Sequence, residues 1–272
     1  MQTIAKERIS IAGNTSTEYN YQKLIEYRGG DPLSISDYSS PYSSRPAISL
    51  LLLRQALHLG GIDADFVYIS CPNPGRSLAE VKKGHAIVYS SDMWEQDFDD
   101  SVYKTSPIIR RGEFQKGIYV KKGSPLLTST NVEDDLKNKI PLVEHTWTID
   151  IALLKSFGFK DMQTAPKYDL LFKMINRNRA DFTILEFPRT NDLTLQDKTG
   201  DLYPIPNAKI VLPYSRHFMV SKINPQGKRV YEALEKGLEI LRKNGTIERA
   251  LRQSGVINDK VKNWKIAFKQ GK

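Results

Sequence analysis

Residues 65–89 read Asp65-Phe-Val-Tyr-Ile-Ser-Cys-Pro-Asn-Pro-Gly-Arg-Ser-Leu-Ala-Glu-Val-Lys-Lys-Gly-His-Ala-Ile-Val-Tyr89. The apolar and β-branched runs at its two ends predict strands over 65–70 and 85–89. Between them, residues 78–83 have the composition of a short helix, which Gly84 ends. A strand, a helix and a strand in this order are typical of a parallel α/β unit, so this stretch decides the fold class.

The pattern continues on both sides of this stretch. Upstream, alternation predicts a strand over 8–12, and a long polar stretch reaching Ser44 is interpreted as a functional loop. Pro46 then opens a helix that ends at Leu59, before two glycines. Downstream, we expect strands over 116–121, 140–144, 180–186, 209–212 and 218–221, and helices over 148–157, 168–176, 226–243 and 246–253.

The composition excludes several classes of protein. Of the 272 residues, 40% are hydrophobic and 26% are charged, which is ordinary for a globular chain and not for a disordered one. The longest apolar stretch, residues 48–53, is broken by Ser49 and is too short to span a bilayer. A single cysteine, Cys71, allows neither an internal disulfide nor a cysteine-based metal cluster.

The net charge of +9 raises the question of a nucleic-acid partner. Residues 216–272 carry 14 basic and 5 acidic side chains, so this segment alone supplies a surplus of 14 − 5 = 9. The surplus coincides with an apolar stripe of helical spacing, formed by Val230, Leu234, Leu238 and Leu241. We interpret it as a solvated helix face and expect no nucleic-acid partner, since Trp264 and Phe268 are too few aromatics for base stacking.

No catalytic motif is visible. The histidines show no i, i+4 pair, which a helical zinc site would need, and the sequence has neither a Gly-x-Ser-x-Gly elbow nor a phosphate loop. We therefore expect no enzyme, no metal and no cofactor. The chain also shows no signal peptide after Met1, which is expected either of a cytoplasmic protein or of a chain from which a leader has been removed.

Several segments together resemble the type II periplasmic solute-binding proteins that serve amino-acid ABC importers. The segments that carry the resemblance are residues 76–88, 102–108, 117–122, 178–186 and 218–222, followed by Asn244-Gly-Thr-Ile. The resemblance implies two α/β lobes joined by two crossing strands, with a ligand in the cleft. Lobe 1 would be discontinuous, with residues 1–112 plus 215–272, and lobe 2 would hold residues 113–214.

The first half of a site is expected directly after the strand that ends at Tyr89. The resemblance implies that Tyr89, Ser90, Ser91 and Asp92 present hydroxyl and backbone groups to a ligand; the alternative is an ordinary polar turn. Trp94 would provide a stacking surface, or would simply pack within its lobe.

The sequence departs from the family a few residues further on. Where the amino-acid binders place an arginine that forks onto the ligand carboxylate, this chain has Asp97 or Phe98. Arg45 and Arg216 are candidates to replace that arginine.

The second half of the site is expected at two places in lobe 2. Thr146, Trp147 and Thr148 lead into a helix, whose N-terminus offers N–H groups to an anion, although Thr148 could simply cap that helix. The resemblance implies that Glu186 faces a cationic part of the ligand; a salt bridge inside the lobe is the alternative.

These observations predict a monomeric, periplasmic solute-binding protein. It would close around a small polar ligand, of the amino-acid class or another, and present it to a membrane transporter permease. A ligand-sensing domain coupled to a membrane sensor, or an enzyme on the same two-lobed scaffold, are the alternatives.

Overall fold

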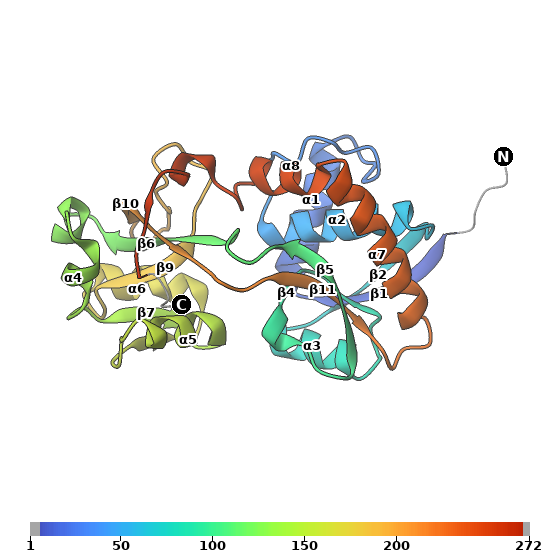
Figure 1. The fold of residues 1–272 in the computed structure, drawn as a ribbon, viewed down its shortest axis with the longest axis horizontal. Coiled ribbons are helices and arrows are strands. Elements are labelled where there is room, and N and C mark those ends of the chain that lie inside the picture. The colour runs from blue at the N-terminus through green and yellow to red at the C-terminus, as the bar shows by residue number, and fades with distance from the viewer. Residues whose placement is uncertain (1–5, 269–272) are drawn as a thin grey trace. The chain divides into compact units, whose positions relative to one another are not determined.

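The structure is a computed structural model and describes residues 6–268. The chain divides into two compact units. Unit 1 comprises the residues up to Arg111 together with Tyr214–Ser254, and unit 2 comprises Gly112–Pro213 and the chain from Gly255 onward (Figure 1). In the described part of the chain, no helix combines the length and the apolar composition needed to cross a membrane.

Unit 1 is built on a six-stranded sheet. Its strands are β1 (Glu7–Gly13), β2 (Ala64–Ser70), β3 (Val88–Tyr89), β4 (Met93–Trp94), β5 (Val102–Ile109) and β11 (Arg216–Ser221). The order is β2-β1-β3-β11-β4, and β5 also pairs with β11. Strands β2, β1 and β3 are parallel, whereas β11 runs antiparallel to its three partners. The turn after β3 therefore lies at the carboxyl end of the parallel strands, where ligands of α/β proteins usually bind.

Five helices accompany this sheet: α1 (Thr15–Tyr27), α2 (Arg45–Leu59), α3 (Pro74–Lys82), α7 (Gly227–Lys243) and α8 (Thr246–Gln253). Helix α2 is buried along its length from Ala47 to Leu57, which explains why most of its side chains are apolar. It packs closely against α7, because a Cβ added to Gly237 would lie 1.8 Å from the carbonyl oxygen of Ala56. A larger residue at this position would push the two helices apart.

Unit 2 has a second six-stranded sheet, in the order β12-β10-β6-β9-β7-β8. Its strands are β6 (Gln115–Lys121), β7 (Pro141–Glu144), β8 (Gln163–Ala165), β9 (Phe182–Glu186), β10 (Leu202–Val211) and β12 (Lys265–Ile266). Its helices are α4 (Val132–Leu136), α5 (Thr148–Ser156) and α6 (Tyr168–Asn176). Short 3₁₀ turns lie at Glu95–Asp97 in unit 1, and at Pro125–Thr128 and Asp259–Val261 in unit 2.

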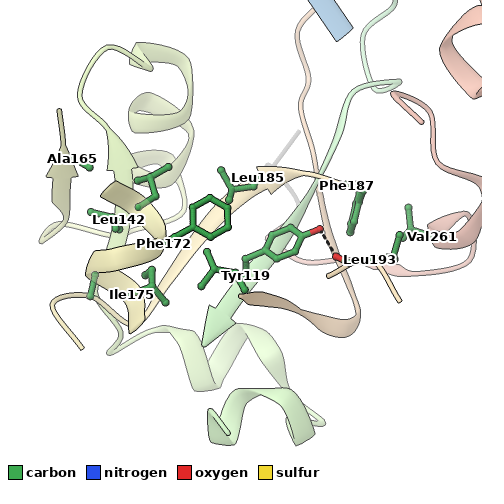
Figure 2. Packing of buried hydrophobic residues seen from close by; sticks show 12 residues of the cluster. Tyr119, Leu142, Ala165, Phe172, Ile175, Leu185, Phe187, Leu193 and Val261 are labelled. Atoms are coloured by element: carbon green, nitrogen blue, oxygen red, sulfur yellow. Dashed lines mark hydrogen bonds between the residues drawn. The ribbon is translucent and has the colours of Figure 1, made fainter. Parts of the chain in front are cut away.

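The core of unit 2 lies where α6 covers the sheet (Figure 2). Phe172 and Ile175 of α6 pack with Leu142 and Leu185 of the strands, and all four side chains are almost fully buried. Tyr119 extends this core and donates its hydroxyl proton to the carbonyl oxygen of Leu193 at 3.1 Å. The polar end of the ring is thereby satisfied, so the tyrosine can be completely buried.

The end of the chain lies in unit 2, whereas the sequence placed all of residues 215–272 in lobe 1. Strand β12 pairs with β10 in parallel. The ammonium group of Lys209 on β10 donates to the carbonyl oxygens of Val261 at 2.7 Å and Lys262 at 3.1 Å. Burial lowers the pKa of Lys209. These contacts join two segments that are far apart in the sequence, which is why periodicity did not reveal them.

Most predicted elements are present, with shifted ends, and three expectations were wrong in part. The polar stretch reaching Ser44 contains helix α1, whose start is capped by the Asn14 side chain accepting from the N–H of Thr17. Only Thr17 and Leu24 of α1 are buried, so it shows no apolar stripe in the sequence. The strand expected over 85–89 is reduced to β3, and strand β5 was not expected.

Candidate functional site

Asp92 is the centre of a polar cluster in unit 1, directly after the short strand β3. Its carboxylate is completely buried and accepts hydrogen bonds from Arg45 Nη1 at 2.8 Å, from the Ser49 hydroxyl at 2.5 Å and from Arg216 Nε. The Ser91 hydroxyl donates to the same carboxylate at 3.1 Å. Arg45 and Ser49 come from the start of α2 and Arg216 from the start of β11, so three elements converge on this one side chain.

Arg216 is the most firmly held member of this cluster. Besides its ion pair with Asp92, it donates from Nη2 to the Asp92 carbonyl oxygen at 2.8 Å. Its guanidinium carbon lies 4.1 Å from the centre of the Trp94 ring, the distance of a cation–π stack. Tyr214 meets the same indole edge-on at 6.5 Å between ring centroids. Both guanidiniums retain a small exposed fraction, 14% for the Arg45 side chain and 8% for that of Arg216.

The electrostatics keep Asp92 ionised. Burial by itself would raise the pKa of this carboxyl, but Arg216, Arg45 and the Ser49 hydroxyl together hold the pKa below its ordinary value. Asp92 therefore positions the two arginines. A guanidinium has five N–H donors in a fixed plane, so one that is oriented by a carboxylate can still serve another acceptor.

Tyr89 and Ser90 are buried, as are Ser91 and Asp92 of the same predicted turn. Burial raises the pKa of Tyr89 to about 12. Ser90 faces Gly13 at the end of β1, where an added Cβ would lie 1.9 Å from the Ser90 hydroxyl oxygen. The burial of Tyr89 and Ser90 indicates that these two residues pack within unit 1 and support the turn that carries Asp92.

Unit 2 has a polar cluster of its own around the start of α5. Lys116 on β6 forms an ion pair with Asp150 in the first turn of α5, with Nζ 2.5 Å from Oδ1. Both side chains are at least 94% buried. The Lys116 ammonium also lies 4.8 Å from the centre of the Trp147 ring. Trp147 in turn packs against Tyr168 at 6.2 Å between ring centroids.

The residues before α5 do not cap it as expected. Trp147 occupies the N-cap position without a capping hydrogen bond, and Thr148 is the first helical residue. The Thr146 hydroxyl donates instead to the Glu144 carboxylate, whose other oxygen lies 2.9 Å from His145 Nδ1. The N-cap side chain thus makes no capping hydrogen bond, and the Thr148 N–H donates to the Thr146 carbonyl oxygen at 2.9 Å. The dipole at the start of a helix favours an anion.

Glu186, the last residue of β9, lies opposite Lys116 in the register of β6 and β9. It is half-buried at the end of an otherwise buried strand. Thr146, Trp147 and Glu186 therefore belong to the same neighbourhood as Lys116.

Lys116, Asp150 and Ser49 were missed as site residues, although each had a signal in the sequence. Ser49 and Asp150 stand inside apolar runs, and Lys116 directly precedes one, and such a side chain needs a partner when its element is buried. Within residues 6–268, no group of three or more His, Cys, Asp or Glu side chains is arranged to hold a metal ion.

Two α/β units, the first of which is interrupted by the second, define the two-lobed fold of the type II periplasmic binding proteins. The chain is similar to a probable amino-acid ABC transporter extracellular-binding protein, ytmK, from Bacillus subtilis. The two share 13% identity at a TM-score of 0.62, over 92% of this chain and 99% of that one.

Two other solved structures show the same fold. One is the amino acid ABC transporter substrate-binding protein AbpA from Streptococcus pneumoniae, bound to L-arginine (14% identity, TM-score 0.56, 93% of this chain and 97% of that one). The other is the periplasmic VFT2 domain of BvgS from Bordetella pertussis (11% identity, TM-score 0.56, 95% and 93%). No protein-family model matches the sequence, and no curated protein matches it either. At these identities the likeness establishes the fold.

Proposed function

We propose that this chain is an extracytoplasmic solute-binding protein that closes around a small carboxylate-bearing ligand and presents it to a membrane transporter. The observation that carries the proposal is the pair of arginines held by Asp92 at the carboxyl end of the parallel strands in unit 1. Orienting a guanidinium in advance lowers the entropic cost of binding, and its planar fork matches a carboxylate.

Trp94 suggests the rest of the ligand. Its ring is half-buried and carries Arg216 on its face, so a ligand that reaches the guanidinium also comes close to an aromatic surface. We therefore expect a ligand with an apolar or ring-bearing body beside its carboxylate. In unit 2, Thr146, Trp147, Thr148 and Glu186 are proposed to contribute further contacts, with Glu186 directed at a cationic group where the ligand has one.

The comparisons support a binding role, because two of the similar structures named above are described as binding proteins of amino-acid ABC transporters. A sensor domain coupled to a membrane receptor is the second candidate, favoured by the likeness to the BvgS domain. Both candidates need the same ligand site, and they differ only in the membrane partner that reads the closed state.

The proposal is tested by a thermal-shift screen of amino acids, organic acids, polyamines and short peptides. A ligand bound only to the folded state adds about 2.7 kcal/mol at a hundredfold excess over its dissociation constant, which raises the melting temperature measurably. We expect the hits to carry a carboxylate. Hits confined to polyamines would contradict the role of the arginines, and a full panel without a shift would contradict the solute-binding function.

Titration of each hit by calorimetry then tests the site itself. Arg45→Met should weaken binding roughly ten- to hundredfold, the loss of one charge-assisted hydrogen bond. Tyr19→Ala is the matched control, because Tyr19 is an exposed aromatic residue of unit 1 outside the Asp92 cluster. Equal affinities for the two variants would remove Arg45 from the site.

A further inference from the structure

Unit 1 contains a cavity of about 480 Å³ at the end of α7, which the proposed function does not use. Its apolar lining comes from Pro107 at the end of β5, Leu238 on α7 and Ile247 on α8. None of the residues that line it belongs to the Asp92 cluster. Its volume is in the range of sites for small molecules.

An irregularity in β5 forms one wall of this cavity. Pro107 and Ile109 pair with His217 and Arg216 of β11, so Ile108 is an extra residue that bulges out of the ladder. The carbonyl oxygens of Pro107 and Ile108 accept instead from Arg242 Nη2, at 2.5 and 3.0 Å. Arg242 is thereby fixed at the wall of the cavity.

A second contact fastens the same strand to α7. Ser106, also part of the lining, donates from its backbone N–H and its hydroxyl to the two carboxylate oxygens of Glu235, at 2.5 and 2.8 Å. On the opposite side, Gly245 adopts a φ of 75°, which allows α8 to begin directly after α7. The turn brings Ile247 into the lining beside Leu238, so the cavity is built by the fold before any ligand arrives.

The charged residues of the lining are mostly basic. Arg110, Arg242 and Lys243 line the cavity together with one carboxylate, that of Glu239. Apolar side chains beside basic groups match a molecule that has both an anionic head and an apolar body. A purely apolar partner would leave the basic surplus of the lining without a counter-charge.

We propose that this cavity is a second binding site, which takes a small amphiphilic anion: a carboxylate or phosphate joined to a hydrocarbon or ring body. The site is independent of the Asp92 cluster and does not rest on the proposed function. The two sites can therefore be tested separately.

The test uses octanoate as the probe, with octanol and acetate as controls for its tail and its head. Protein labelled at isoleucine and leucine methyl groups is titrated with each compound by nuclear magnetic resonance. We expect octanoate to shift the methyl signals of Leu238 and Ile247 with an affinity at least tenfold above that of either control. Octyl phosphate distinguishes the two possible heads: tighter binding than octanoate assigns the site to phosphates, and weaker binding assigns it to carboxylates.

Two variants locate the head group. Lys243→Glu reverses an exposed charge of the lining and should weaken octanoate binding at least fivefold, whereas Lys236→Glu makes the same change on the same helix outside the lining. Trp94→Ala alters the Asp92 cluster, so it should leave the octanoate-induced shifts of the Leu238 and Ile247 methyl signals unchanged. The proposal is wrong if octanoate binds no better than octanol, if the two lysine variants behave alike, or if Trp94→Ala abolishes the shifts.

Discussion

Each unit carries a polar cluster built on an aspartate, a cation and a tryptophan, and the two clusters differ in how the charges are shared. In each unit a buried aspartate holds a cation against the face of a tryptophan: Asp92 with Arg216 on Trp94, and Asp150 with Lys116 on Trp147. In unit 1 one carboxylate serves two guanidiniums, whereas in unit 2 it serves a single ammonium.

The difference matters because the two cations respond differently to burial. A guanidinium keeps its charge in any protein environment, whereas an ammonium that loses its partner can give up its proton. The cluster of unit 1 is therefore a fixed charge centre suited to an anionic ligand. The cluster of unit 2 is an ion pair without net charge, and it mainly fixes the start of α5 and the orientation of Trp147.

The largest expected effect on the free energy of unfolding comes from replacing the aspartate of either cluster, each in a separate variant. Asp92→Asn removes the buried counter-charge that Arg45 and Arg216 share, which should lower the free energy of unfolding by about 3–5 kcal/mol. Asp150→Asn should cost only about 1–3 kcal/mol, since Lys116 can be neutralised. Chemical denaturation of both variants measures the difference. Equal losses would mean that the two clusters are energetically equivalent.

The next effect concerns acid sensitivity and is confined to unit 1. His217 follows Arg216, is buried, and lies 2.6 Å from the Thr105 carbonyl oxygen through Nδ1. Burial lowers the pKa of His217 below its ordinary value near 6.5, although the Thr105 carbonyl opposes this. The unfolded chain therefore binds the proton more readily. The contribution of His217 to the free energy of unfolding is complete above about pH 7. It falls as the pH drops below 6.5 toward the pKa of the folded state, by about 1.4 kcal/mol per pH unit.

Unfolding measured between pH 7.5 and 5 checks this expectation. His217→Gln should reduce the slope in that range, whereas His58→Gln, at an exposed position of the same unit, should leave it unchanged. An unaltered slope in the His217 variant would show that another group causes any acid sensitivity.

The fold was largely predictable because it depends on local patterns. The strand–helix–strand stretch of residues 65–89 and the glycines that end the helices are read directly from neighbouring residues. The path of residues 255–268 was not predictable, because it depends on Lys209, some 50 residues away, finding two carbonyl oxygens.

The sequence indicated some residues of the two polar clusters, but not the roles of those residues. Asp92, Arg45 and Arg216 were all expected near a ligand. The sequence could not show that both arginines form ion pairs with the Asp92 carboxylate. Such pairing joins residues 45, 92 and 216 across three elements, and only the register of β11 and the start of α2 determine it. Lys116 and Asp150 were overlooked because their ion pair also joins two elements, β6 and α5, and the sequence around either residue does not reveal the other.

The smallest expected effect is the difference between the two cation–π contacts. Arg216 lies closer to Trp94 than Lys116 does to Trp147, at 4.1 against 4.8 Å, and a guanidinium is more weakly hydrated than an ammonium and stacks flat on an indole. The coupling energy of the Arg216–Trp94 pair should therefore exceed that of the Lys116–Trp147 pair, by about 0.5–1 kcal/mol. Double-mutant cycles that combine Trp94→Leu with Arg216→Met, and Trp147→Leu with Lys116→Met, measure the two energies while cancelling the lost packing of each single change. A larger coupling in unit 2 would mean that the buried ammonium depends on its ring more than the guanidinium does, and the view of unit 2 as a self-contained neutral pair would fail.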